Sequence, residues 1–190
     1  MAAKIRVLPA TPERWPDLAA LFGSRGACGG CWCMYWRRTA ADFNRRKGRA
    51  NRASLRGLVT SGRLPGLLAY IDRTPAGWCS VGPRDVFPRL EQSRVLRRID
   101  AEPVWSVVCF YVSQSHRRQG ISVALLEGAA AFARRQGARI LEGYPVEPCG
   151  SDYADAFAWT GSAEAFRAAG FVEARRASPT RPIMRRYLGA

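Results

Sequence analysis

Residues 113–122 combine a polar turn, two arginines and a glycine directly in front of an apolar helical pattern. A turn that enters a helix in this way exposes backbone N–H groups without intrahelical partners, and the positive end of the helix dipole lies behind them. Gly120 has no Cβ to keep phosphate oxygens away from the backbone. The side chains of Arg117 and Arg118 add positive charge, and Ser122 is small and offers a further donor. The segment therefore predicts a site for a pyrophosphate.

Residues 28–37, CGGCWCMYWR, form the second group of side chains that could do chemistry. The spacing of Cys28, Cys31 and Cys33 is compatible with zinc, but a structural zinc site needs four ligands. Because no second cysteine pair or nearby histidine follows, the distant Cys79 or Cys149 would have to complete such a site. A redox-active thiol pair is the other chemistry that this spacing allows, and the sequence leaves the choice open.

The elements around the predicted anion site are the clearest in the chain. Residues 104–112 are rich in β-branched and aromatic types and predict a strand. Residues 121–136 predict a helix, because Val123, Leu126, Ala130 and Ala133 share one face and Gly137 ends the pattern. Further strands are expected at 5–8, 66–71, 77–81, 138–144, 171–175 and 183–188, and helices at 12–22, 39–61 and 162–169. Helices and strands alternate without repeat or linker, which predicts a single mixed α/β domain.

Composition limits the classes of function. The chain has 190 residues, 30 Lys+Arg against 15 Asp+Glu and a net charge of +15, while 47% of its residues are hydrophobic, which excludes a disordered polycation. Excess positive charge indicates anionic partners such as nucleic acid, a membrane surface or a phosphorylated small molecule. Residues 1–8 lack the apolar run of a signal peptide, and no stretch reaches the length of a membrane span. We therefore expect a cytoplasmic protein with reduced thiols.

The strand, turn and helix at 104–137 resemble the GNAT superfamily of acyl-CoA-dependent N-acyltransferases. The signature of that family is Arg/Gln-x-x-Gly-x-Gly/Ala between the fourth strand and the third helix, and Arg117, Gly120 and Ser122 match it. The order of elements also fits the family over almost the whole chain. The resemblance implies an α/β (α+β) fold: one domain over residues 1–190, with a mixed central sheet of six to seven strands flanked by about four helices. Within it we expect an acceptor-side loop at 23–38, an acetyl-CoA-binding core at 104–137, and a closing helix and strands at 162–188.

The same resemblance implies an N-acetyltransferase that moves acetyl from acetyl-CoA to a primary amine by direct attack. Acetyl-CoA would be the co-substrate, with no metal, and would lie where the fourth and fifth strands splay apart. Its pantetheine and thioester would pair with backbone groups of Phe110, Tyr111 and Val112. Its pyrophosphate would bind the segment made of Arg117, Arg118, Gln119, Gly120, Ile121 and Ser122. The expected partners are acetyl-CoA and an amine-bearing acceptor, with a homodimer as an option and no membrane.

The chain departs from the family pattern at the positions that move protons. Many members have a tyrosine as the acid for the coenzyme A thiolate, where this chain has Phe166. The start of the fourth strand offers only Ser106 in place of a carboxylate base. Candidates by proximity are Glu142, Tyr144 and Tyr153, with a solvated strand carboxylate as the alternative for Glu142 and packing at the rim of the strand as the alternative for Tyr144. Cys109 is interpreted as a small buried residue and His116 as a turn residue rather than as a catalytic pair.

By the resemblance, the cysteine- and tryptophan-rich segment overhangs the acceptor side of the thioester. Its side chains could line an acceptor pocket or simply fill the core, and both alternatives stay open for Trp32, Met34, Tyr35, Trp36 and Arg37. Two other functions also remain. One is a catalytically degenerate acyl-CoA sensor, suggested by Phe166. The other is an arginine-rich nucleic-acid-binding domain, suggested by the basic segment 45–56, although no recognised nucleic-acid motif accompanies it.

Overall fold

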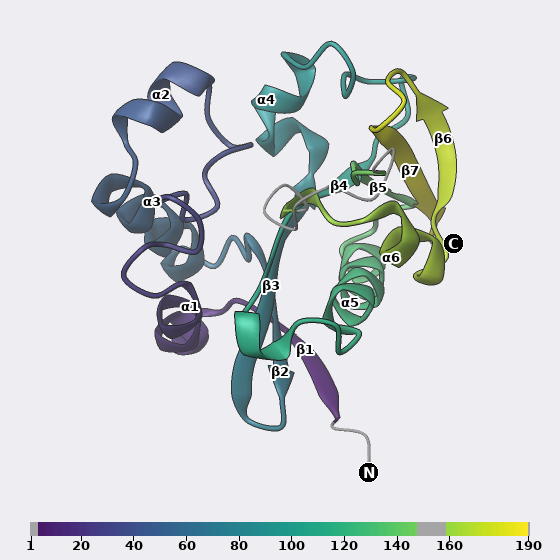
Figure 1. Ribbon diagram of the computed structural model, residues 1–190. Helices are drawn as coiled ribbons and strands as arrows, with labels where there is room; N and C mark the ends of the chain where they lie inside the picture. Colours follow the sequence, from purple (N-terminus) through teal and green to yellow (C-terminus); the bar gives the residue numbers. More distant parts are fainter. Residues whose placement is uncertain (1–3, 148–158, 190) are drawn as a thin grey trace.

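The computed structural model describes residues 4–147 and 159–189, and its strands form one sheet (Figure 1). The strand order is β1-β2-β3-β4-β5-β7-β6, so the prediction of a six- to seven-stranded mixed sheet is confirmed. Among the pairs of neighbouring strands in this sheet, only β4 and β5 run parallel. The strands are β1 (Ile5–Pro9), β2 (Gly66–Ile71), β3 (Thr74–Pro83), β4 (Trp105–Val112), β5 (Ile140–Gly143), β6 (Val172–Arg176) and β7 (Pro182–Tyr187).

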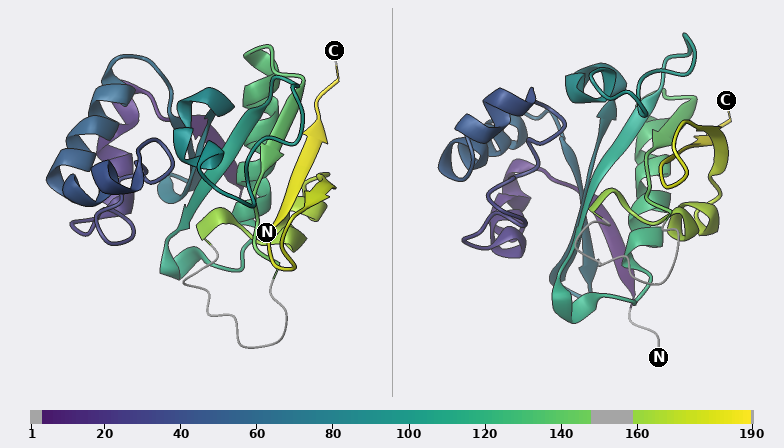
Figure 2. Two further views of the ribbon diagram at one scale, coloured as in Figure 1. Left: turned by 90° about the horizontal axis from the view of Figure 1, so that it is seen from above. Right: turned by 45° about the horizontal axis from the view of Figure 1, so that its top comes forward.

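Helices cover both faces of the sheet, as Figure 2 shows from above. One face carries α1 (Trp15–Phe22), α2 (Ala40–Arg45) and α3 (Arg49–Thr60), and the other carries α5 (Ile121–Arg135) and α6 (Ala163–Ala168). The short α4 (Pro88–Glu91) lies in the connection between β3 and β4. Short 3-10 turns occupy Pro12–Arg14, Arg84–Val86 and Gln114–His116. Within the described ranges, no helix is long and apolar enough to cross a membrane.

The central strand β4 separates from its neighbour halfway along its length. Only Trp105–Val107 pair with β5, at Leu141–Gly143, whereas β4 continues to Val112. On its other side, Ser80 of β3 pairs with Cys109 and the next residue, Val81, pairs with Val107, so Val108 is the extra residue of a β-bulge. A bulge bends a strand and changes the direction of its backbone groups. Among the described residues, the second half of β4 therefore has a free edge that faces a gap in the sheet.

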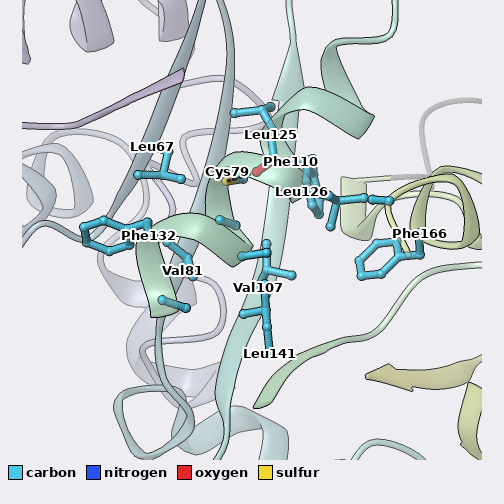
Figure 3. Close-up of a cluster of buried hydrophobic side chains, with 14 of the residues drawn as sticks. Leu67, Cys79, Val81, Val107, Phe110, Leu125, Leu126, Phe132, Leu141 and Phe166 are labelled. Atoms are coloured by element: carbon cyan, nitrogen blue, oxygen red, sulfur yellow. Dashed lines mark hydrogen bonds between the residues drawn. The ribbon is translucent and has the colours of Figure 1, made fainter. Parts of the chain in front are cut away.

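Helix α5 closes the core beneath β3 and β4. Its apolar face contributes Leu125, Leu126 and Phe132, which pack against strand residues such as Val81 and Val107 (Figure 3). A Cβ on Gly128 would lie 2.5 Å from the side chain of Val7, so glycine allows this helix to approach β1 closely. This packing fixes the N-terminal end of α5 beside the free edge of β4.

Two of the element predictions need correction. The segment 39–61 is two helices, α2 and α3, because the chain turns at Gly48 with a φ of +77°. The N–H group of Gly48 donates to the carbonyl of Gly30 at 3.0 Å, and a Cβ on Gly30 would lie 2.7 Å from that nitrogen. This close contact between two glycines anchors the cysteine-rich segment to the helices. The strand expected at 77–81 is also longer, since β3 pairs with β2 from Thr74.

Candidate functional site

A cleft of about 1010 Å³ opens beside the free edge of β4. Its walls are the second half of β4, the turn that leads into α5, the cysteine-rich segment and α6. Segments far apart in the sequence therefore meet around one space, and most of the residues singled out in the sequence lie along it. The sections of this cleft differ in chemistry.

The turn before α5 presents a row of backbone donors to the cleft. Arg118 and Gly120 adopt positive φ angles of 60° and 76°, and the amides of residues 118–123 make no backbone hydrogen bond within the described ranges. A Cβ on Gly120 would meet no atom of the described residues within 4 Å, so these residues leave the space above the turn open. Unpaired amides at the start of a 15-residue helix, together with exposed Arg117, fit the diphosphate of coenzyme A.

Most of the residues predicted to hold the cofactor line this cleft. They are Phe110, Tyr111, Val112, Arg117, Arg118, Gly120, Ile121 and Ser122. Gln119 is not among them, since its side chain turns back and donates to the carbonyl of Ser115 at 3.3 Å. The backbone of β4 beyond the bulge is the natural partner for an extended amide chain, because a free strand edge offers alternating donors and acceptors.

The predicted acceptor residues divide among three places. Tyr35 and Trp36 line the cleft, where both rings contact Trp159 at centroid distances of 4.7 and 5.6 Å. Trp32 packs inside the core against Phe22 at 5.6 Å, which agrees with the core-filling alternative for that residue. Met34 and Arg37 line a second, separate cavity. Side chains of this segment therefore line two separate cavities, and others pack in the core.

Trp159 was not predicted as a site residue, because the sequence before it shows no hydrophobic periodicity. Glu164 was missed as well, although it is an exposed carboxylate on α6 that lines the cleft. His116 lines the cleft near the turn, and its Nδ1 lies 2.7 Å from the hydroxyl of Ser113. These residues give the cleft an aromatic wall and titratable groups that only the tertiary arrangement brings together.

Glu142 and Tyr144 are fully buried and belong to an ionic network away from the cleft. The carboxylate of Glu142 pairs with Arg84 and with Arg185, both at 2.8 Å. The hydroxyl of Tyr144 donates to Glu142 at 2.7 Å and lies 2.8 Å from the hydroxyl of Ser106. Burial raises the pKa of Tyr144 well above its usual range. Because each polar group already has partners, this arrangement is typical of a structural network.

The remaining expectations for proton transfer concern Tyr153, Phe166 and Ser106. Tyr153 lies outside the described residues. Phe166 is completely buried and packs against Phe110 and Phe171 at 6.0 and 4.9 Å, so this position belongs to the core rather than to the cleft. Ser106 is also completely buried in the network of Tyr144. Among the described residues, Glu142, Tyr144 and Ser106 do not line the cleft, and a catalytic role of Tyr153 stays a prediction.

Thiols gather at the wall of the cleft nearest the bulge. The sulfur atoms of Cys33 and Cys109 are 3.7 Å apart, and Cys28 and Cys31 line the same space. Cys79 lies in the hydrophobic cluster on the α5 side, whereas Cys33 and Cys109 belong to the cluster on the other face of the sheet. Cys79 therefore cannot complete a zinc site with them. Across the described parts of the chain, no group of three or more potential ligands could hold a metal ion.

Cys31 has an unusually acidic thiol. A hydrogen bond from the Cys33 thiol, helped by nearby backbone amides, lowers the pKa of Cys31 to about 6. Its alkylation by iodoacetamide should therefore rise with pH and reach half its maximum near pH 6, rather than near the usual thiol value of about 8.5. Acetyl-CoA should slow the reaction, because Cys31 lines the cleft. Cys28 and Cys31 lie on one tryptic peptide, so fragment-ion mass spectrometry is needed to locate the label on Cys31. A midpoint near the usual thiol value would contradict the expectation.

The sequence model of the acetyltransferase (GNAT) family matches residues 31–158. No curated sequence matches this chain. Similar folds include a GNAT-family protein from Desulfovibrio desulfuricans, with 16% identity and a TM-score of 0.55, covering 98% of this chain and 100% of the other.

Two further structures of the same fold were solved with ligands. One is yncA from Salmonella typhimurium with its cofactor acetyl-CoA, at 14% identity and a TM-score of 0.52, covering 97% and 94% of the two chains. The other is the paia N-acetyltransferase from Thermoplasma acidophilum in complex with coenzyme A, at 14% identity and a TM-score of 0.53, covering 97% and 99%. The strand–turn–helix of the cleft lies within the matched residues 31–158. The chain therefore belongs to the GNAT acetyltransferase family, whose activity is acyl-CoA-dependent acetyl transfer.

Proposed function

We propose that this protein transfers acetyl from acetyl-CoA to a primary amine by direct attack of the amine on the thioester. One observation carries the proposal: the free edge of β4, the unpaired amides before α5 and an aromatic wall line a single cleft. Acetyl-CoA would extend along β4 with its diphosphate on residues 118–123. Its thioester would then lie near the bulge at Val108, and the amine would approach from the side of Tyr35 and Trp36.

The residues of the cleft contribute mainly binding and positioning. Holding an amine next to a thioester converts a bimolecular reaction into an effectively unimolecular one. Backbone amides at the bulge would donate to the carbonyl oxygen of the thioester, which becomes negatively charged when the amine attacks. Proton removal requires a group within reach of the amine, and Glu164 and His116 are two titratable side chains that line the cleft. Glu142 and Tyr144 fit a structural role better, since their polar atoms already pair inside the protein.

A panel of amines tests the proposed reaction. Acetyl-CoA is incubated with the protein and single amines, amino acids and peptides, and products are identified by mass. At least one amine should gain one acetyl group, with coenzyme A released in equal amount. Binding of acetyl-CoA without transfer to any amine would contradict the enzyme and favour the sensor, which the buried Phe166 suggests. Absence of acetyl-CoA binding would contradict both.

Substitution of Trp36 tests the acceptor side. Trp36 is only 6% exposed and contacts Tyr35 and Trp159 along the cleft. We expect Trp36→Ala to lower kcat/KM for the amine by about tenfold or more, because an aromatic anchor of the pocket is removed. The affinity for acetyl-CoA, measured by calorimetry, should change little. An equal loss of both, together with a lower melting temperature, would show that Trp36 only packs the core.

A further inference from the structure

A second cavity of about 900 Å³ lies toward the C-terminal end of α5. Ile121, the first residue of this helix, lines the cleft, whereas Phe132 lines the second cavity. Eleven residues of helix separate the two positions by about 16 Å. Within the described ranges the two spaces share no lining residue. The second cavity is therefore separate from the space assigned to acetyl-CoA and its acceptor.

Arg37 brings into this cavity a positive charge that has no carboxylate partner among the described residues. Its Nη2 donates to the carbonyl of Pro65 at 3.1 Å, and its guanidinium lies 4.6 Å from the centre of the Phe87 ring. Its Nε is buried without a hydrogen-bond partner. Burial lowers the pKa of Arg37 to about 10. Arg37 is half-buried, and a charge largely removed from water normally has a counter-ion, so its lack of one among the described residues requires an explanation.

The neighbouring Arg38 strengthens the positive character of the same space. It pairs with Asp42 and donates to the hydroxyl of Ser54 at 2.6 Å, while its own Nε is also buried without a partner. Asp42 in turn contacts two further arginines, Arg45 and Arg46, so its single charge is shared among three cations. Asp42 lines the same cavity, but among the described residues no ion pair joins it to Arg37.

We propose that the second cavity binds a small organic anion, a carboxylate or phosphate carried on an apolar body, with the Arg37 guanidinium as its main contact. A guanidinium donates in parallel to two oxygens of such a group, which is a strong and directional pairing. The walls suit the rest of the ligand, since Met34, Val81, Trp105 and Phe132 are apolar. This site does not depend on the proposed amine transfer, because it uses none of the residues of the cleft.

Tryptophan signals allow each space to be observed separately. Trp105 lines the second cavity, whereas Trp36 and Trp159 line the cleft. The protein is labelled at its indole nitrogens, the signals are assigned by single Trp→Phe substitutions, and coenzyme A is added to saturation to fill the anion site before α5. Benzoate and phenyl phosphate are then titrated at constant ionic strength against benzamide, a neutral analogue of the same shape.

We expect benzoate and phenyl phosphate to move the Trp105 signal in a saturable manner, and benzamide to move it much less. Arg37→Met should weaken benzoate binding by about tenfold or more, the effect of losing one charge-assisted pair. Arg56→Met, which removes an exposed arginine of α3 outside this cavity, should leave it unchanged. The comparison of benzoate with benzamide needs no variant, so it stands even if Arg37→Met folds poorly. Equal binding of benzoate and benzamide, or a response confined to Trp36 and Trp159, would overturn the proposal.

Discussion

Gly120→Glu should weaken acetyl-CoA binding by about 100-fold or more, which corresponds to about 2.7 kcal/mol. Backbone strain, like charge and added volume all act in the same direction. Gly120 has a φ of +76°, a conformation that costs any other residue roughly 1–2 kcal/mol. The new carboxylate would also lie at the helix N-terminus where the diphosphate is expected, so a like charge and added volume would oppose the ligand.

A matched control separates strain from ligand binding. Gly137 follows the other end of α5 with a φ of +84° and does not line the cleft. Gly137→Glu therefore introduces the same side chain with similar backbone strain but away from the expected diphosphate. Calorimetry with acetyl-CoA should show a large loss for Gly120→Glu and an affinity near that of the parent for Gly137→Glu. Equal affinity of both variants for acetyl-CoA would contradict the assignment of the turn.

Arg84→Met should lower the free energy of unfolding by about 3–5 kcal/mol, because it breaks a buried ionic network from one side. Arg84 is 2% exposed and its guanidinium contacts four groups: Glu91 at 2.7 Å, Glu142 at 2.8 Å, the hydroxyl of Tyr144 at 2.5 Å and the carbonyl of Leu96 at 2.8 Å. Methionine fills part of the space but leaves Glu142 with Arg185 as its remaining cationic partner. The melting temperature should fall by roughly 10 °C for a chain of this size.

Arg98→Met provides the control for this prediction. Arg98 also contacts Glu91, at 3.4 Å, but its side chain is 37% exposed and its other partner, Asp85, is almost fully exposed. An exposed ion pair contributes about 0–1 kcal/mol, so the melting temperature of this variant should change little. Thermal unfolding followed by circular dichroism compares the two. A melting temperature for Arg84→Met equal to that of Arg98→Met would contradict the structural role of the network.

The sequence was most informative where local chemistry determines structure. The strand at 104–112, the turn and the helix from Ile121 follow from β-branched residues, a glycine and one apolar face, and all three lie where they were predicted. Local sequence patterns also predicted the bounds of the closing helix and of the two strands that follow it. Their positions therefore required no knowledge of which segments meet in space.

The acceptor side could not be derived in this way. Between Cys31 and Arg37 the backbone is irregular, with positive φ at Trp32 and Cys33, so no period indicates which side chains share a face. Consequently Tyr35 and Trp36 turn to the cleft while Arg37 turns to another cavity. Glu142 and Tyr144 are two residues apart, so the alternation of an extended chain predicts that they point to the same side. Their shared partner Arg84, however, lies 58 and 60 residues away in the sequence. Only the folded chain shows that these groups are already paired.

A crystal structure of the protein with acetyl-CoA would show directly where the cofactor binds. We expect the diphosphate on the amides of residues 118–123, the pantetheine along the free edge of β4, and the acetyl group beside Val108 facing Trp36. A diphosphate bound away from this turn, or acetyl-CoA found only in the second cavity beside Arg37, would contradict it.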